Sequence, residues 1–186
     1  DMEILPEVSV ALAGAYEYSG LTVKVLETIP NVLDLISNDS RNISYIGLNV
    51  DQYVLLCNSC ATSSSEMGNF KHAKVFLEKG LRKAAQISDL VGIGILEFQH
   101  GFHYFLKGDG FQSLRHLQNG LNVLKKVEHY YFQGFALAFQ GRAFYLTGDS
   151  TKAVELIEKG IKLLIEGGGV PSQSGNYNGL SEIYLQ

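Results

Sequence analysis

The sequence is poor in the residues that mark several classes of protein. Its 186 residues include no tryptophan, three prolines and two cysteines. Two cysteines are too few for the disulfide framework of a small secreted domain, so the composition favours a reducing, cytoplasmic compartment. The longest apolar runs, Val10 to Tyr16 and Leu90 to Leu96, fall far short of the roughly 20 residues of a transmembrane helix. We therefore expect no membrane-spanning segment.

The chain also lacks an excess of positive charge. It carries 15 Lys and Arg against 19 Asp and Glu, and the basic residues are scattered among the acidic ones. A nucleic-acid-binding segment needs a basic face that neutralises phosphates, so we expect no nucleic-acid partner. Apolar residues make up 46% of the chain, with ten Tyr and ten Phe. This composition supports a folded core and excludes a disordered tail.

A glycine-bounded pattern is repeated along the chain. Its copies run from Gly68 to Gly80, from Gly108 to Gly120 and from Gly148 to Gly160, so they are 40 residues apart. A small residue precedes each first glycine by seven positions, namely Ala61, Gly101 and Gly141. Partial copies lie further out, at Ala13, Tyr16 and Gly20 before the pattern and at Ser181 and Tyr184 after it. Such a period is the signature of a stacked repeat architecture.

Each element of the pattern has a physical reason. The first glycines are expected to end helices in the left-handed conformation, which glycine adopts without Cβ strain. Asp109 and Ser150 are then placed to cap the following helices. Small residues at 61, 101 and 141 would let the two helices of a hairpin approach closely, opposite Ala73, Ser113 and Ala153. Glycines at 80, 120 and 160 fall inside helices, where they cost about 1 kcal/mol, and this predicts a close crossing with the next repeat.

These residues resemble the tetratricopeptide repeat (TPR). The likeness lies in a small residue, an aromatic three positions later and a glycine four beyond, as in Gly101, Tyr104 and Gly108. The standard repeat has about 34 residues. The longer form here is similar to the C-terminal repeat regions of large signalling ATPases, including transcriptional activators of the maltose-regulator type and ATPase-linked adenylate cyclases or protein kinases.

The resemblance implies an all-α fold, a right-handed superhelical solenoid of antiparallel helix hairpins. We expect one domain over residues 1–186 with about four to four and a half repeats, itself a fragment of a longer protein. The expected boundaries are about 6–45, 50–88, 91–127 and 131–167, with a half repeat at about 172–186. The signature tryptophan is absent, since Glu97 and Leu137 occupy its place, and Ser64 replaces an aromatic. Pro30 is expected to kink or interrupt the second helix of the first repeat.

The resemblance also implies where a ligand would lie. Ligands of such repeats usually follow residues that project from the first helices along the concave face. By register these positions are Asn58, Thr62, Ser65, Phe98, Phe102, Phe105, Ala138, Arg142 and Tyr145. The alternative is that the three phenylalanines pack under a neighbouring helix or a second copy of the chain.

Residues with reactive side chains do not combine into a catalytic set. Cys57 and Cys60 have C-x-x-C spacing, but no second pair completes a zinc site, and we expect both thiols to pack as small hydrophobes. Glu97, His100 and His103 share one expected helix, without a nucleophile or a carboxylate pair beside them. We interpret these histidines as structural or surface residues, and His72, His116 and His129 as solvated. The sequence thus predicts no catalytic residue, no metal site and no cofactor.

Three functions are compatible with the sequence. The first is a scaffold or sensor segment of a larger signalling protein, which binds a protein partner or a second copy of itself. The second is a domain that senses a small-molecule effector and regulates an attached ATPase or transcriptional regulator. An enzyme is the third and least favoured, because the repeat explains nearly every unusual residue.

Overall fold

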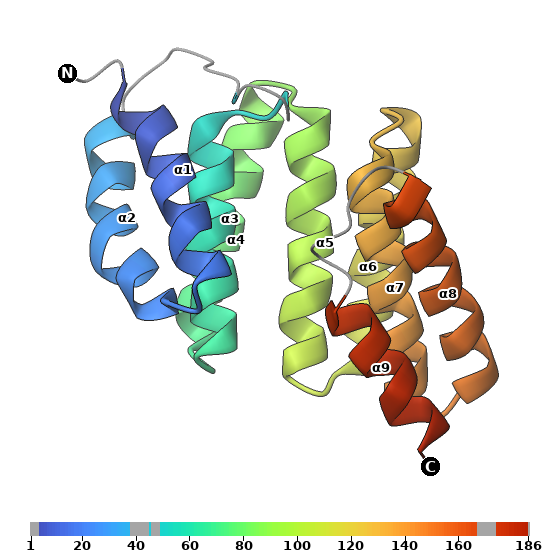
Figure 1. Cartoon of the computed structure of the whole chain (residues 1–186). Helices are drawn as coiled ribbons and strands as arrows, with labels where there is room; N and C mark the ends of the chain where they lie inside the picture. Colours follow the sequence, from blue (N-terminus) through green and yellow to red (C-terminus); the bar gives the residue numbers. More distant parts are fainter. Residues whose placement is uncertain (1–3, 38–44, 46–48, 167–173, 186) are drawn as a thin grey trace. The chain divides into compact units, whose positions relative to one another are not determined.

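The computed structural model describes residues 4–37, 45, 49–166 and 174–185, and over these residues it is helical (Figure 1). Its elements are α1 (Leu5–Tyr18), α2 (Thr22–Ile36), α3 (Gln52–Glu66), α4 (Phe70–Gln86), α5 (Leu90–Leu106), α6 (Gly110–Lys126), α7 (Tyr130–Leu146), α8 (Ser150–Glu166) and α9 (Ser174–Tyr184). None of these helices combines the length and apolar character needed to cross a membrane.

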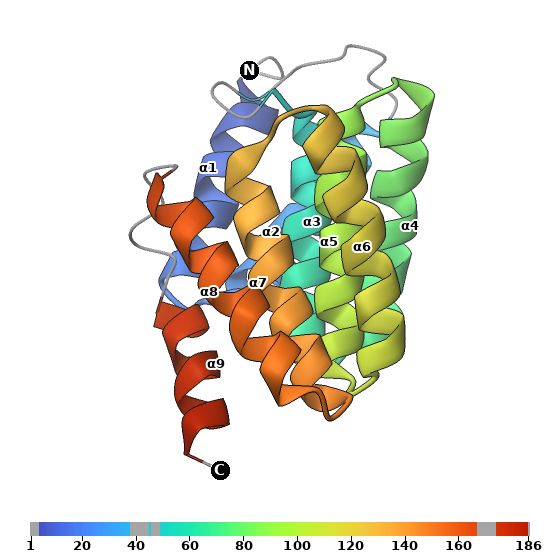
Figure 2. The ribbon, with the colours of Figure 1, turned by 90° about the vertical axis from the view of Figure 1, so that its right-hand side faces the viewer.

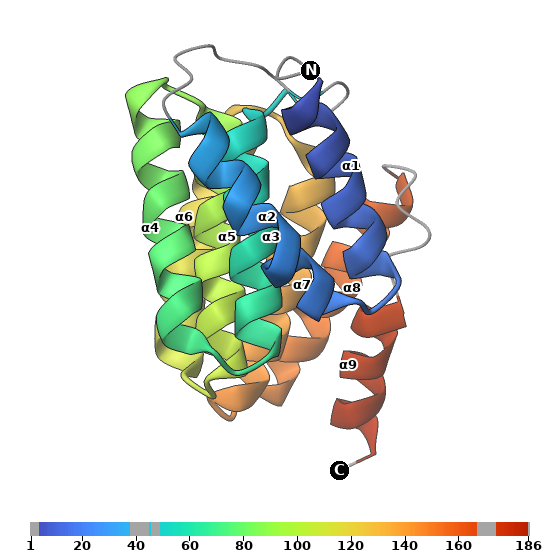
Figure 3. The same ribbon diagram turned by 90° about the vertical axis from the view of Figure 1, so that its left-hand side faces the viewer.

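The chain divides into two compact units, residues 1–99 and residues 100–186, with the division inside α5. In the first unit, α1 and α2 lie against α3, and α3 pairs with α4 (Figure 3). In the second unit, α6 contacts α7, α7 pairs with α8, and α9 lies beside α8 (Figure 2). Each unit has its own core, which includes Ile29, Leu56 and Leu77 in the first and Leu117, Leu124, Ile157 and Leu164 in the second.

The glycines that open the repeated pattern lie in the tight turns between paired helices. Gly68, Gly108 and Gly148 have φ angles of 73°, 76° and 91°, in the left-handed region. The prediction that these glycines end helices is therefore confirmed. Ser88 and Glu128, also 40 residues apart, have φ angles of 56° and 54° in the turns that follow α4 and α6. The sequence pattern did not predict these left-handed residues, because neither is a glycine.

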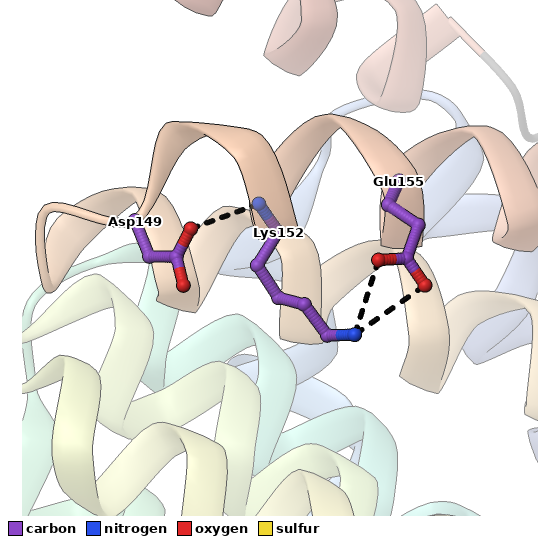
Figure 4. A network of polar contacts seen from close by, with 3 residues as sticks. All are labelled: Asp149, Lys152 and Glu155. Carbon is purple, nitrogen blue, oxygen red and sulfur yellow. Dashed lines mark hydrogen bonds and ion pairs between the residues drawn. The ribbon is translucent and has the colours of Figure 1, made fainter.

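Aspartates cap two of the repeated second helices. The Asp109 carboxylate accepts a hydrogen bond of 3.0 Å from the backbone N–H of Gln112, as predicted. The prediction of a Ser150 cap is wrong, since the Asp149 carboxylate accepts from the backbone N–H of Lys152 at 2.9 Å instead. Ser150 is the first residue of α8, one position too late to cap it. Figure 4 shows this cap and the ion pair that Lys152 makes with Glu155.

Small residues bring α7 and α8 into close contact at two levels. A Cβ atom on Gly141 would lie 2.5 Å from the carbonyl oxygen of Ala153, and one on Gly160 would lie 2.6 Å from that of Gly134. The predicted contact within a hairpin is confirmed. We expected Gly160 to contact the next repeat, and this expectation is wrong. Gly160 instead faces Gly134 and Ala138 of α7, the partner helix of its own hairpin. Gly80 contacts both neighbours, with Cys57 in its own hairpin and Leu96 in the next one.

Two further expectations concern α2 and α3. The α2 helix runs from Thr22 to Ile36 with Pro30 inside it, so the proline does not interrupt the helix. In α3, Cys57 and Cys60 are free thiols and fully buried, which confirms that they pack as small hydrophobes. Burial also raises the pKa of the Cys57 thiol to about 12, so the reactive thiolate is suppressed.

Candidate partner-binding surface

The second unit brings together four of its aromatic and cationic side chains, which we call the Phe–Arg cluster: Phe102 and Phe105 from α5, and Phe139 and Arg142 from α7. The rings of Phe102 and Phe139 pack edge to face, with centroids 5.2 Å apart. Phe105 meets Phe139 in the same way at 5.8 Å. The Cζ atom of Arg142 lies 4.6 Å from the Phe105 centroid and 5.1 Å from the Phe139 centroid. A guanidinium at this distance over two ring faces makes favourable cation–π contacts.

The Arg142 side chain is half-buried and carries a positive charge. Burial lowers the pKa of Arg142, and the negative charge of Glu182 opposes that shift. An arginine stays protonated at neutral pH even so. Among the described residues, Arg142 makes cation–π contacts with Phe105 and Phe139, and no carboxylate forms an ion pair with it. The arrangement therefore places a positively charged, planar guanidinium group beside an aromatic surface.

The α9 helix borders the cluster on one side. A Cβ atom on Gly179 would lie 3.4 Å from the Cγ and Cδ atoms of Arg142, which is ordinary packing distance. The aliphatic stem of Arg142 is thus held between α9 and the phenylalanine rings. Packing on both sides limits the rotamers of Arg142, so less entropy is lost when its guanidinium binds a ligand.

Three of the residues predicted from the sequence belong to this cluster, and Tyr145 lies one turn beyond Arg142 on α7. Tyr145 is half-buried, like Phe102, Phe105 and Arg142. Phe139 was missed, although it lies three residues before Arg142 on the same helical face. Phe102 and Phe105 pack against Phe139 of the neighbouring α7 helix, as the alternative interpretation held for them, yet both remain partly exposed. Ala138 is fully buried against Gly160 and is unavailable to a partner.

The predicted residues of the first unit form a weaker candidate. Asn58 and Thr62 are half-buried on α3, where the Thr62 hydroxyl donates a hydrogen bond of 3.0 Å to the Asn58 carbonyl oxygen. Ser65 is only 2% exposed, so a partner cannot reach its side chain in this conformation. Phe98 is half-buried and takes part in other contacts. No cationic side chain is among these four residues.

A shallow hollow lies elsewhere in the second unit, between α8 and α9. Its volume is about 380 Å³, and its lining consists of Glu158, Ile161, Lys162, Ile165, Glu166, Tyr177 and Leu180. None of the residues predicted to bind a partner lines it. The Phe–Arg cluster is therefore the candidate surface that sequence and structure share.

The fold is similar to the crystal structure of a putative kinesin light chain from Podospora anserina with nearly identical TPR-like repeats. The TM-score is 0.63 and the sequence identity 16%, and the alignment covers 99% of this chain and 86% of that one. At this identity the likeness shows the fold alone, and it confirms the prediction of an all-α array of TPR-like helix hairpins. No protein-family model and no curated protein matches the sequence.

Proposed function

We propose that this chain is a protein-interaction scaffold whose second unit binds a segment of a partner protein at the Phe–Arg cluster. The observation that carries the proposal is the position of Arg142, whose guanidinium packs on two phenylalanine rings and forms no ion pair with a carboxylate of the described residues. Arginine and aromatic residues in partly desolvated positions are the usual anchors of protein interfaces. The TPR-like fold, which commonly serves as a non-catalytic scaffold, supports this choice over an enzyme.

The chemistry of the cluster defines the partner segment. A guanidinium presents parallel N–H donors that match a carboxylate in a bidentate geometry. The neighbouring rings of Phe102 and Phe105 offer apolar contact area next to that donor pair. The proposed ligand is therefore a peptide that carries a carboxylate, from Asp, Glu or a chain terminus, beside a bulky apolar side chain.

The proposal extends to the biological setting. The long form of the repeat supports a regulatory segment of a larger signalling protein in the cytoplasm, where the cluster would recruit or sense a partner. Self-association is the other form that such an interaction takes, with a second copy of the chain as the partner. Sedimentation of the purified chain over a range of concentrations distinguishes the two.

A small-molecule effector is the second candidate, and the same observation favours it. A compact carboxylate ligand would also fit a guanidinium flanked by aromatic rings. A ligand that binds only the folded state raises the melting temperature, so thermal-shift measurements with carboxylate metabolites test this candidate. A peptide and a small carboxylate would then compete for Arg142.

The test of the scaffold proposal is selection from a displayed library of random peptides on the purified chain. We expect enrichment of peptides with an acidic residue next to a bulky apolar one, and at least about tenfold weaker binding to an Arg142→Ala, Phe102→Ala double variant. Arg115→Ala is the matched control, because Arg115 is an exposed arginine of the same unit on α6. Failure to enrich such peptides, or equal binding by the double variant, would contradict the proposal.

A further inference from the structure

The α1 helix of the first unit exposes an apolar face opposite the face that it buries. It packs against α2 and α3, and its buried residues are Pro6, Ser9 and Ala13. On the other side, exposed apolar residues follow one another at intervals of four, three, four and three positions. We call this set the α1 seam: Ile4, Val8, Ala11, Ala15 and Tyr18. A surface helix normally turns polar residues toward water, so this face is expected to pack against another molecule.

The side chains of the seam expose a large part of their surface. Ile4, which directly precedes α1 and has helical backbone angles, is 55% exposed, and so is Val8. Tyr18 is 82% exposed, and Leu12 beside the seam is 38% exposed. The two alanines between them are exposed as well. Single apolar residues on a protein surface are ordinary, but a continuous apolar strip marks an interaction surface.

We propose that the α1 seam pairs with the α1 seam of a second copy of this chain, as two antiparallel helices related by a two-fold axis. Alternating intervals of four and three residues give the 3.5-residue period at which two helices pack knobs into holes. The seam belongs to the first unit and the Phe–Arg cluster to the second. Neither proposal depends on the other.

The charges of α1 identify a second copy as the partner. The helix contains Glu7 and Glu17 but no lysine, arginine or histidine, and no residue of the seam is charged. A helix that lies on an anionic membrane has a basic polar face, which α1 lacks. A charged partner protein would meet no opposite charge on the seam. An uncharged apolar strip is complementary to itself, as the identical surfaces of a two-fold dimer must be.

The sizes of the seam residues favour the antiparallel direction. In this direction, Ile4 and Val8 of one copy lie opposite Ala15 and Ala11 of the other. Each layer then pairs a branched side chain with a methyl group, which fills the layers evenly. Parallel pairing would place Ile4 on Ile4 and Ala11 on Ala11, and a gap would remain between the alanines. The macrodipoles of two helices also attract each other when the helices are antiparallel.

The exposed area of the seam predicts a weak dimer. Together with Leu12, the seam exposes on the order of 500 Å² per copy, so that pairing would bury about 1,000 Å² in total. This total is near the lower limit for a specific interface. We therefore expect a dissociation constant of roughly 1 to 100 μM.

The test is sedimentation equilibrium of the purified chain from about 1 to 200 μM. We expect a monomer–dimer equilibrium, and at least about tenfold weaker dimerisation by Val8→Lys and by Ala11→Lys, because each buries an unpaired charge in the interface. Circular dichroism confirms that each variant folds. Leu35→Lys is the matched control, since Leu35 is 61% exposed on α2 and outside the seam. The Arg142→Ala, Phe102→Ala double variant should also dimerise like the wild type, which separates this interface from the Phe–Arg cluster.

Cysteine cross-linking tests the direction of the pair. Cys57 and Cys60 are fully buried, so an introduced surface cysteine is the reactive thiol. Under a mild oxidant, Ile4→Cys mixed with Ala15→Cys should form a disulfide between the two variants. Ala15→Cys alone should not, because the two copies of this position lie roughly 16 Å apart along antiparallel helices.

Several results would overturn the proposal. A chain that is monomeric at every concentration excludes the dimer, and binding of that monomer to phosphatidylcholine vesicles would assign the seam to a membrane surface instead. Undiminished dimerisation by folded Val8→Lys and Ala11→Lys would place the interface elsewhere. Efficient cross-linking of Ala15→Cys alone would show that the helices are parallel.

Discussion

The Cζ atom of Arg142 lies 4.6 Å from the centre of the Phe105 ring, so that a charged group of α7 rests on an aromatic group of α5. The contact is partly buried, and α9 covers the arginine stem at Gly179. One side chain thus links three helices of the second unit. The same contact that orients the guanidinium for a partner also contributes to the stability of the unit.

This double role leads to a prediction about stability. We expect Arg142→Ala to lower the free energy of unfolding by about 1 to 2 kcal/mol, because a partly desolvated cation–π contact with two rings is lost. Arg142→Lys should cost less, since the charge remains while the planar stacking is lost. Urea unfolding measures both variants, with Arg115→Ala as the exposed control. An unchanged Arg142→Ala midpoint would show that the contact has no energetic weight.

The space around two helical glycines predicts opposite effects of alanine substitution on stability, because Gly160 lies at the close crossing of α7 and α8 and Gly14 does not. Gly160→Ala should destabilise the protein by about 1 to 3 kcal/mol, because the new Cβ atom would lie 2.6 Å from the Gly134 carbonyl oxygen. Gly14→Ala should stabilise it by about 0.5 to 1 kcal/mol, since nothing lies within 4 Å of that site in α1. Chemical denaturation compares them, and a stabilising Gly160→Ala would refute the close crossing.

Two adjacent residues at the start of α8 should differ in how much their side chains stabilise the helix. Asp149→Ala should lower stability by about 1 kcal/mol, because the carboxylate that accepts from the Lys152 N–H is removed. Ser150→Ala should change stability by less than about 0.5 kcal/mol, since this exposed residue lies within the first turn. Thermal unfolding of both variants gives the comparison. A larger loss of stability for Ser150→Ala than for Asp149→Ala would contradict the Asp149 cap and support capping by Ser150, as predicted from the sequence.

The raised pKa of Glu17 predicts that the stability of the first unit depends on pH. Burial is the main cause that raises its pKa to about 7, with the nearby charge of Glu66 adding to it and a hydrogen bond with Ser59 opposing it. The folded chain therefore holds a proton that the unfolded chain releases near pH 4.5. Stability contributed by the protonated carboxyl is full below pH 4.5 and is lost as the pH rises through about 7.

We expect Glu17→Gln to remove this dependence. The melting temperature of the wild type should fall more between pH 5 and pH 8 than that of the variant, so the difference between the two curves isolates the contribution of Glu17. Glu7→Gln, an exposed position on the same helix, is the control and should follow the wild type. Parallel curves for Glu17→Gln and wild type would contradict the raised pKa.

Much of the fold was predictable because the repeat records backbone constraints. Gly108 and Gly148 mark left-handed turns, where other residues are strained, and Gly141 marks a helix contact with no room for a Cβ atom. Such constraints depend on local conformation and recur at every period. The exact start of α8 was less certain, because Asp149 and Ser150 are both good capping residues and only the structure shows which one precedes the helix.

The candidate sites were predictable only in part, because they depend on how one helix is rotated against another. Phe102, Phe105 and Arg142 were placed on a common surface by their register. Arg142 contacts Phe105 directly, and Phe102 joins them through Phe139. The register carried no information on side-chain burial, so it also selected Ser65 and Ala138, which are buried. The α1 seam had no clear signal, because α1 carries apolar residues on both sides and only its packing on α2 and α3 shows which side is exposed.

The most direct test of the central claim is a double-mutant cycle between Arg142 and the carboxylate of a selected peptide. Affinities are measured for wild type and Arg142→Ala, each with the acidic peptide and with the same peptide carrying an amide in place of the carboxylate. The account predicts a coupling free energy of about 1.5 to 3 kcal/mol, as for a charge-assisted hydrogen-bonded pair. A coupling near zero, with each change acting independently, would show that Arg142 does not recognise the carboxylate and would contradict the proposed binding surface.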